Sequence, residues 1–284
     1  MNGYPFEKIK RCFFTILKYF TLCFGAFVAV VPVAVCIITA LKTPEEYAST
    51  NVMSPPSNWL YFENFKYAWS KANMFLGFRN SFFILIVVLT GSIMIGTMLA
   101  YVLNRFTFPG NQLIRKLFLF ATLIPGVATQ VTVYQIMNHM NLVNTMRGYI
   151  LLMMGTDVIS IYIFIQFFEN ISISIDESAI MDGASYYTIF FRILFPLLKP
   201  AIVTCMILKG VSTYNEYYMA SLYLQSKDRL VTVATSLYTF VGPLGSQFNY
   251  ICAGVLITIL PALIIFILCQ KQIYSGLTKG SVKG

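Results

Sequence analysis

The chain has 284 residues, of which 57% are hydrophobic and only 11% are charged. Soluble domains carry roughly 25% charged residues, so this chain has too few polar side chains to cover a water-facing surface. The composition argues against a free-standing soluble enzyme and predicts an all-α polytopic membrane protein surrounded by lipid. A net charge of +9 would favour nucleic acid in a soluble protein. Here the basic residues lie between apolar runs, so we expect no nucleic-acid partner.

Six segments are long and apolar enough to cross a bilayer as helices, which takes about 20 residues. They are Tyr19–Leu41, Ser81–Leu103, Leu117–Met137, Gly148–Phe168, Pro200–Leu222 and Ile251–Cys269. The fourth segment contains one acid, Asp157, and the fifth contains Lys209 and Glu216. Three of the spans are expected to be interrupted by a proline: Pro32, Pro125 and Pro261. In lipid such breaks survive only where protein or water satisfies the freed carbonyl groups.

The basic residues predict the orientation of these spans. The first apolar run follows Lys8, Lys10 and Arg11 and is 23 residues long, which exceeds the 7–15 residues of a signal-peptide core, so we expect a permanent helix. With the amino terminus inside, twelve Lys and Arg residues lie on the inner side and seven on the outer side. This bias places both termini in the cytoplasm.

The spans suggest two regions. Residues 1–78 would hold the amino-terminal tail, the first span and an outer loop with short interfacial helices. Residues 79–284 would hold five spans, a cytoplasmic loop at 169–199 and a carboxy-terminal tail at 271–284. The six cysteines form no CxxC pair and no cluster with the single histidine, His139. We therefore expect free thiols, no metal site and no catalytic residue.

The loop at 169–199 carries the most specific local signal. Ser174-Ile175-Asp176-Glu177 has the form of a capping box, which predicts that a helix begins at Ser174. Gly183 can supply the left-handed residue that ends this helix, and a second amphipathic helix is expected from Tyr186 to Leu194, before Pro196. A helix of two turns is unstable alone. It must dock either on this protein's own inner surface or on a separate soluble protein.

Within this loop the sequence runs Glu177-Ser178-Ala179, three residues, Gly183, nine residues and Ile193-Leu194-Phe195-Pro196. This pattern resembles the EAA signature of ABC importer permeases. Ser178 and Phe195 depart mildly from the family pattern. Other segments resemble the maltose-type, carbohydrate-importing branch: Arg79-Asn80-Ser81, Ala100-Tyr101, Arg105-Phe106-x-Phe108-Pro109-Gly110, Ile124-Pro125-Gly126, Leu142-Val143-Asn144-Thr145, Tyr214-Asn215-Glu216-Tyr217 and the ending 276–284.

The resemblance implies a six-helix permease subunit in the bacterial cytoplasmic membrane. Its partners would be a second, homologous permease, two ATPase subunits and an extracytoplasmic solute-binding protein that delivers a carbohydrate, in particular an oligosaccharide. The residues that would couple the chain to the ATPase are Glu177, Ser178, Ala179, Asp182, Gly183 and Ala184. The chain has no GxxxxGK[ST] loop, so ATP and Mg²⁺ would bind the ATPase subunits and this chain would carry no cofactor. The alternatives are a permease for a non-sugar solute and a self-sufficient secondary carrier or channel.

Ionisable residues inside spans are costly and therefore candidates for function. Glu216 lies among Tyr214, Asn215 and Tyr217, a set that could contact sugar hydroxyls in the solute path. Alternatively, Glu216 reaches the membrane interface or ties two helices together. Asp157 and Lys209 are each expected near mid-depth, where they could form an ion pair or take part in the solute path.

Overall fold

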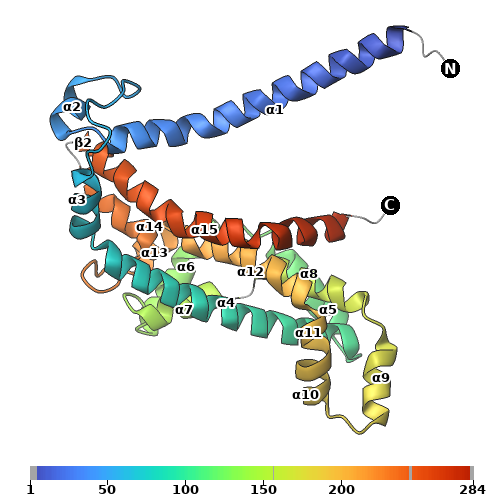
Figure 1. Ribbon diagram of the computed structural model, residues 1–284. Helices are drawn as coiled ribbons and strands as arrows, with labels where there is room; N and C mark the ends of the chain where they lie inside the picture. Colours follow the sequence, from blue (N-terminus) through green and yellow to red (C-terminus); the bar gives the residue numbers. More distant parts are fainter. Residues whose placement is uncertain (1–4, 156, 243–244, 282–284) are drawn as a thin grey trace. The chain divides into compact units, whose positions relative to one another are not determined.

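The computed structural model describes residues 5–155, 157–242 and 245–281 (Figure 1). These residues are helical except for loops and two short antiparallel strands, β1 (Val241–Gly242) and β2 (Gly245–Ser246), in which Val241 pairs with Ser246. The chain forms two compact units. Unit 1 contains residues 1–72 and 237–260, and unit 2 contains residues 73–236 and 261–284. Residues 237–260 thus group with the amino-terminal part, and the functional division at residue 78 stays a prediction.

Unit 1 begins with the first long helix, of which only the last residues are buried. Its elements are α1 (Pro5–Ala40), α2 (Pro44–Ser49), α3 (Glu63–Lys71), the 3₁₀ helix η2 (Leu237–Phe240), the two strands and the first part of α15 (Phe248–Ser281). The buried Asn64 amide of α3 donates to the carbonyls of Ala40 at 2.8 Å and Lys42 at 2.7 Å. These bonds satisfy carbonyl groups that the end of α1 leaves free. Helices α2 and α3 lie where short helices are expected between the first two spans, and their place at the outer membrane interface stays a prediction.

Unit 2 holds most of the remaining helices. They are α4 (Met74–Arg105), α5 (Asn111–Ala121), α6 (Gly126–His139), α7 (Met146–Met154), α8 (Val158–Glu169), α9 (Ile173–Met181), α10 (Tyr186–Thr188), the π-helical segment η1 (Ile189–Leu194), α11 (Phe195–Leu197), α12 (Lys199–Tyr214), α13 (Tyr218–Tyr223) and α14 (Val233–Ser236). Helix α4 is central, because α7, α8, α12 and α14 all pack against it. Its small residues allow this: a Cβ at Gly96 would lie 3.2 Å from the Phe164 ring of α8, and Ala100 is fully buried.

Five of the six expected spans match three long helices and two bent helix pairs. The fifth differs: Pro200–Leu222 covers α12 and α13, while α12 forms a third bent pair with the segment before it. Lys10–Ala40, Met74–Arg105 and Phe248–Leu268 are long and apolar enough to cross a membrane unbroken. The bent pairs are α5 with α6, α7 with α8, and the segment Tyr186–Leu197 with α12. Among the described residues there are therefore three spans, or up to six if each bent pair crosses as one.

Only one of the three internal prolines breaks its helix. Pro125 lies between α5 and α6, which meet at a bend of 104°. The expectation is wrong for Pro32 and Pro261, since α1 and α15 run through them without interruption. A proline removes one hydrogen bond, and an apolar helix with all its other backbone bonds intact can continue past it in a membrane.

A clamp at the beginning of α4 fixes the segment that precedes α14. The buried Asn80 side chain donates to the carbonyls of Arg229 at 3.0 Å and Val231 at 2.8 Å. Next to it, the Ser81 hydroxyl accepts from the amide of Val233 at 2.9 Å. These bonds give a physical reason for an Asn-Ser pair at the beginning of this span.

We predict that Asn80→Ala destabilises unit 2 by about 1–3 kcal/mol, because it leaves two carbonyl groups without their donor. A lower melting temperature of the purified protein in detergent would show this. Asn170→Ala is the matched control, since the exposed Asn170 amide bonds only to the carbonyl of Gln166 in its own helix. Equal melting temperatures for the two variants would contradict the clamp.

Candidate functional site

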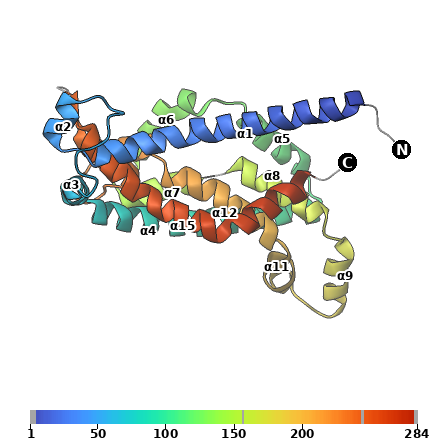
Figure 2. The ribbon, with the colours of Figure 1, turned by 45° about the horizontal axis from the view of Figure 1, so that its top comes forward.

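The first candidate site is the segment from α9 to α11, which projects from one end of unit 2 in both views (Figure 1, Figure 2). Helix α9 begins one residue earlier than expected, at Ile173. Its cap is Ser172, whose hydroxyl accepts from the Ser174 amide at 3.3 Å. The predicted capping box from Ser174 is therefore wrong. Both serines offer the same capping chemistry, and the chain uses the earlier one.

The end of α9 confirms the predicted glycine turn. Gly183 has φ +80°, in the left-handed region that glycine adopts without strain. Its amide donates to the Ile180 carbonyl at 2.9 Å, and the Ala184 amide donates to the Ala179 carbonyl at 2.9 Å. This pair of bonds is the Schellman motif. Asp182 is the last residue before the turn.

Helix α9 has one buried face and one open face. Asp176 and Ala179, three residues apart, are each 7% exposed and so lie on the same face. Ala179 packs in the apolar core that α4, α8 and η1 share. Its side chain therefore contacts this chain, and its contact with an ATPase stays a prediction. The open face of α9 is formed by Glu177, Ser178, Ile180 and Met181.

The second helix of the loop is present but differs in form. It begins at Tyr186, where the Ser185 hydroxyl accepts from the Thr188 amide at 3.3 Å, and becomes π-helical over Ile189–Leu194. The helical segment continues through Pro196 to Leu197 instead of ending before the proline. Tyr186 and Tyr187 are exposed and extend the open surface beyond α9.

A buried arginine joins this loop to α4. Arg105, at the end of α4, forms an ion pair with Asp176 of α9, with 3.2 Å between Nε and Oδ2. The two side chains are 7% and 10% exposed. Arg105 also donates to the carbonyls of Phe168 at 3.3 Å and Ile171 at 2.8 Å, and its guanidinium lies 5.8 Å from the centre of the Phe168 ring. One side chain thus contacts the end of α8, the link after it and α9.

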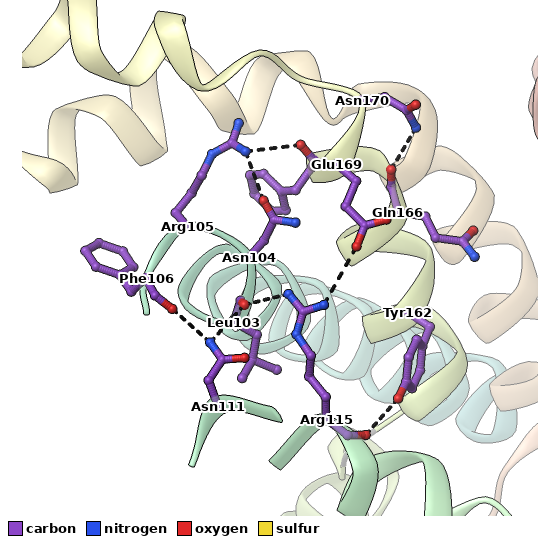
Figure 3. Close-up of polar contacts among 11 residues, drawn as sticks. Leu103, Asn104, Arg105, Phe106, Asn111, Arg115, Tyr162, Gln166, Glu169 and Asn170 are labelled. Carbon is purple, nitrogen blue, oxygen red and sulfur yellow. Dashed lines mark hydrogen bonds and ion pairs between the residues drawn. The ribbon is translucent and has the colours of Figure 1, made fainter. Parts of the chain in front are cut away.

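The carbonyl groups at the end of α4 bond to α5, as Figure 3 shows. Asn111 donates to the carbonyls of Leu103 at 3.0 Å and Phe106 at 2.8 Å, and Arg115 donates to Leu103 at 2.6 Å. Arg115 also lies 3.7 Å from Glu169 in a more exposed ion pair, 30% and 55% accessible. These bonds join the end of α4 to α5, the helix that follows it, whereas the Arg105 contacts join the end of α4 to α8 and α9.

Sequence reasoning missed the Arg105–Asp176 pair. A basic residue at the end of an apolar span indicates topology, and an acid in the first turn of a helix indicates a favourable interaction with the helix dipole. Both readings are local. Only the packing of α8 and α9 against α4 reveals that the two residues meet.

The second candidate site is a break in the fifth predicted span. Helix α12 ends at Tyr214 and α13 begins at Tyr218, so Asn215, Glu216 and Tyr217 lie between two helices. Glu216 accepts from the Met219 amide at 2.9 Å, which caps α13. Tyr218 donates to Gln130 of α6 at 2.9 Å. The structure therefore brings the expected polar and aromatic groups together at an irregular stretch of backbone.

The expected ion pair between Asp157 and Lys209 is not among the ion pairs of the described residues. Asp157 instead caps α8, where its carboxylate accepts from the Ser160 hydroxyl at 2.8 Å and, more weakly, from the Ser160 amide at 3.4 Å. Similar depth along two helices says nothing about which way the side chains face. The positive end of α8 stabilises this carboxylate without a cation.

With this geometry established, comparisons with known proteins identify the family. The profile of the family described as "Binding-protein-dependent transport system inner membrane component" matches residues 71–272. The chain belongs to this family. As an inner membrane component it is a multi-pass protein of the cytoplasmic membrane and a permease subunit of an ABC importer, not an enzyme. Membership also removes the alternative of a self-sufficient carrier or channel.

Relatives of this inner membrane component match it over nearly its whole length. The arabinooligosaccharides transport system permease protein of Halalkalibacterium halodurans is 31% identical, over 92% of this chain and 94% of the relative. The galactooligosaccharides transport system permease protein of Bacillus subtilis is 26% identical over 98% of both chains. A crystal structure of a bacterial ABC transporter involved in the import of the acidic polysaccharide alginate has the same fold, with a TM-score of 0.82 over 95% of this chain and 99% of the other at 20% identity.

We predict that Gly183→Ala slows transport by the assembled importer. The added Cβ would meet no atom within 4 Å. The free-energy cost therefore comes from placing alanine in a left-handed backbone conformation, about 1–2 kcal/mol, which is roughly 5 to 30-fold in an equilibrium constant. Initial rates of ATP-driven uptake measure the effect. Gly126→Ala is the control, because Gly126 also has open space but no positive φ. Equal rates for both variants would show that the turn is not needed.

Proposed function

We propose that this chain is one of two homologous permease subunits of an ATP-driven importer for oligosaccharides. An extracytoplasmic solute-binding protein delivers the sugar, and two ATPase subunits bind ATP and Mg²⁺. The observation that carries the substrate class is that relatives aligned over nearly the full chain are named for oligosaccharides. These include the arabino- and galactooligosaccharide permeases and a maltodextrin permease of Streptococcus pneumoniae, 27% identical over 98% of both chains.

The open face of α9 supports the assignment of the ATPase-docking site. Met181 is 86% exposed and Tyr187 75% exposed, so two large side chains outside the expected spans are left open for a partner to cover. Glu177 on the same face supplies a carboxylate for a basic residue of the ATPase. Asp182, Gly183 and Ala184 form the turn that ends this face, and Ser178 lies on it next to Glu177.

The charge distribution supports a cytoplasmic position for both termini and for the 169–199 loop. Arg105, Arg115 and Lys116 cluster between the second and third spans, on the same side as the loop, and short cytoplasmic connections are enriched in such residues. The loop would then face the ATPase subunits, whereas the segment clamped by Asn80 would face the solute-binding protein.

The proposed docking of α9 leads to the following transport cycle. ATP draws the two ATPase subunits together, and their docked surfaces move the coupling helices, which open the permease pair outward to receive sugar. Hydrolysis resets the pair to the inward-facing state. Because a partner can shift such an equilibrium only by binding one state better than the other, the contacts of α9 must differ between the two ATPase states.

The break between α12 and α13 is the proposed solute path of this subunit. In transporters, irregular backbone at membrane depth occurs where it lines a cavity. Tyr214 and Tyr217 supply aromatic faces for sugar rings, and Asn215 supplies an amide for sugar hydroxyls. Glu216 positions α13 through its bond to Met219.

The direct test is uptake by the complete system. The tagged chain would be purified from its own host in mild detergent and reconstituted in vesicles with its co-purified subunits and binding protein. Arabino-, galacto- and maltooligosaccharides would be offered with and without internal ATP. We expect ATP-dependent accumulation of one of these classes. Accumulation of a non-sugar solute alone would contradict the substrate assignment.

We predict that Glu177→Gln weakens the coupling of ATP hydrolysis to transport, because the docked carboxylate loses its charge. A charge-assisted hydrogen bond contributes about 1.5–3 kcal/mol, so uptake should fall roughly tenfold or more. The control is Glu169→Gln, which removes an exposed carboxylate of the same region. A Glu177→Gln importer with full uptake would contradict the docking role.

We predict that Asn215→Ala raises the sugar concentration for half-maximal uptake, while Glu216→Gln leaves it nearly unchanged. The glutamine keeps the carbonyl oxygen that caps α13, whereas Asn215→Ala removes a sugar ligand. Concentration-dependent uptake in vesicles separates the two. If Glu216→Gln is the more damaging variant, the charge of Glu216 acts on the solute and the capping interpretation fails.

A further inference from the structure

We infer that Arg105 is a positioning residue that makes the coupling helix α9 and the spanning helix α4 move as one body. The inference rests on the proposed docking of α9 to an ATPase and adds the route by which the motion of α9 reaches a membrane span. The Arg105 clamp is defined as Arg105 with its three partners: the Asp176 carboxylate and the carbonyls of Phe168 and Ile171.

The first argument is the burial of the clamp. The Arg105 and Asp176 side chains are 7% and 10% exposed and lie 3.2 Å apart. Removing one partner would leave a buried charge without compensation, which is strongly unfavourable. The clamp therefore resists opening much more than an exposed ion pair does. The Arg115–Glu169 contact, 3.7 Å long and largely exposed, provides the contrast within the same region.

The second argument is the number of elements that one guanidinium joins. Its Nη1 atom reaches Phe168 at 3.3 Å and its Nη2 atom reaches Ile171 at 2.8 Å, while Nε faces Asp176. The planar group has a rigid fork of donors, so its two hydrogen bonds and the 3.2 Å charge contact together restrict how α9 and the end of α8 can lie relative to α4. A patch of apolar contacts would permit sliding.

Few other contacts hold α9 against this chain. Helix α9 has nine residues, too few to be stable without packing, and its open face is turned away from this chain. On its buried face, Asp176 and Ala179 are the buried residues. A displacement applied to the open face is thus resisted by the Ala179 packing and the Arg105 clamp. Of the two, the clamp contains hydrogen bonds, which depend on direction as well as distance.

The test compares four variants in the complete reconstituted importer. Asp176→Asn weakens the clamp and leaves Arg105 buried without its counter-charge. The double variant Arg105→Met/Asp176→Leu removes both charges together, which a buried site usually tolerates. Arg105→Lys keeps the charge but loses the fork of donors. Glu169→Gln is the control, because it removes the exposed carboxylate that pairs with Arg115.

The measured quantities are co-purification with the ATPase and sugar imported per ATP hydrolysed. We expect all assembled clamp variants to keep ATP hydrolysis but to import at least about fivefold less sugar per ATP, the lower end of typical coupling effects, while Glu169→Gln keeps the wild-type ratio. A wild-type ratio of sugar imported per ATP in the double variant would overturn the inference, because transport would then be fully coupled without the Arg105–Asp176 ion pair. Failure of Asp176→Asn and the double variant to assemble would also overturn it, because the pair would then serve folding.

A distance measurement separates this inference from the proposed function. Spin labels would replace Val102 on α4 and Ile173 at the start of α9, both exposed and outside the open face defined above, in the complete complex with its native cysteines replaced by alanine. We expect one narrow distance distribution in the wild-type background and a broad one with Asp176→Asn. The same narrow distribution in both would overturn the inference whatever solute the importer carries. Absence of sugar uptake by the wild-type complex would instead count against the proposed function.

Discussion

The buried contact between Arg105 and Asp176 is the constraint on which the arrangement of the loop at 169–199 depends. Two charges taken out of water are stable only when they meet and when their remaining donors are bonded. Arg105 donates to the end of α8 and to the link before α9, whereas its Nε and the Asp176 Oδ2 are held by their 3.2 Å charge contact, without a hydrogen bond among the described residues. The observed placement of α9 satisfies this requirement, because it brings the Asp176 carboxylate within 3.2 Å of the Arg105 guanidinium.

The consequence is a division of α9 into two faces with different partners. Asp176 and Ala179 belong to the core of unit 2, and Glu177, Ile180 and Met181 are left open. The Schellman turn at Gly183 ends the helix where the open surface passes to Tyr186 and Tyr187. A short helix with one satisfied face and one open face that carries both apolar side chains and a carboxylate is suited to docking on a second protein.

Much of this was predictable from the sequence, because the signals are local. The spans follow from runs of apolar residues, and the turn at Gly183 follows from the one residue type that tolerates a left-handed backbone. The helix start was misplaced because Ser172 and Ser174 have the same chemistry. The Asp157–Lys209 pair is not among the ion pairs of the described residues, and depth in the membrane does not specify direction around a helix axis. The Arg105 clamp could not be predicted from a pattern, since it exists only once α8 and α9 pack on α4.

The docking of the open face of α9 on an ATPase subunit is the central claim, and site-specific photo-crosslinking tests it most directly. A photo-reactive amino acid would replace Met181, which is 86% exposed on α9, and, in a second variant, Met140, which is 58% exposed after α6. In the assembled importer, we expect the Met181 probe to capture the ATPase subunit and the Met140 probe not to capture it. Capture of the ATPase from Met140 but not from Met181 would contradict it.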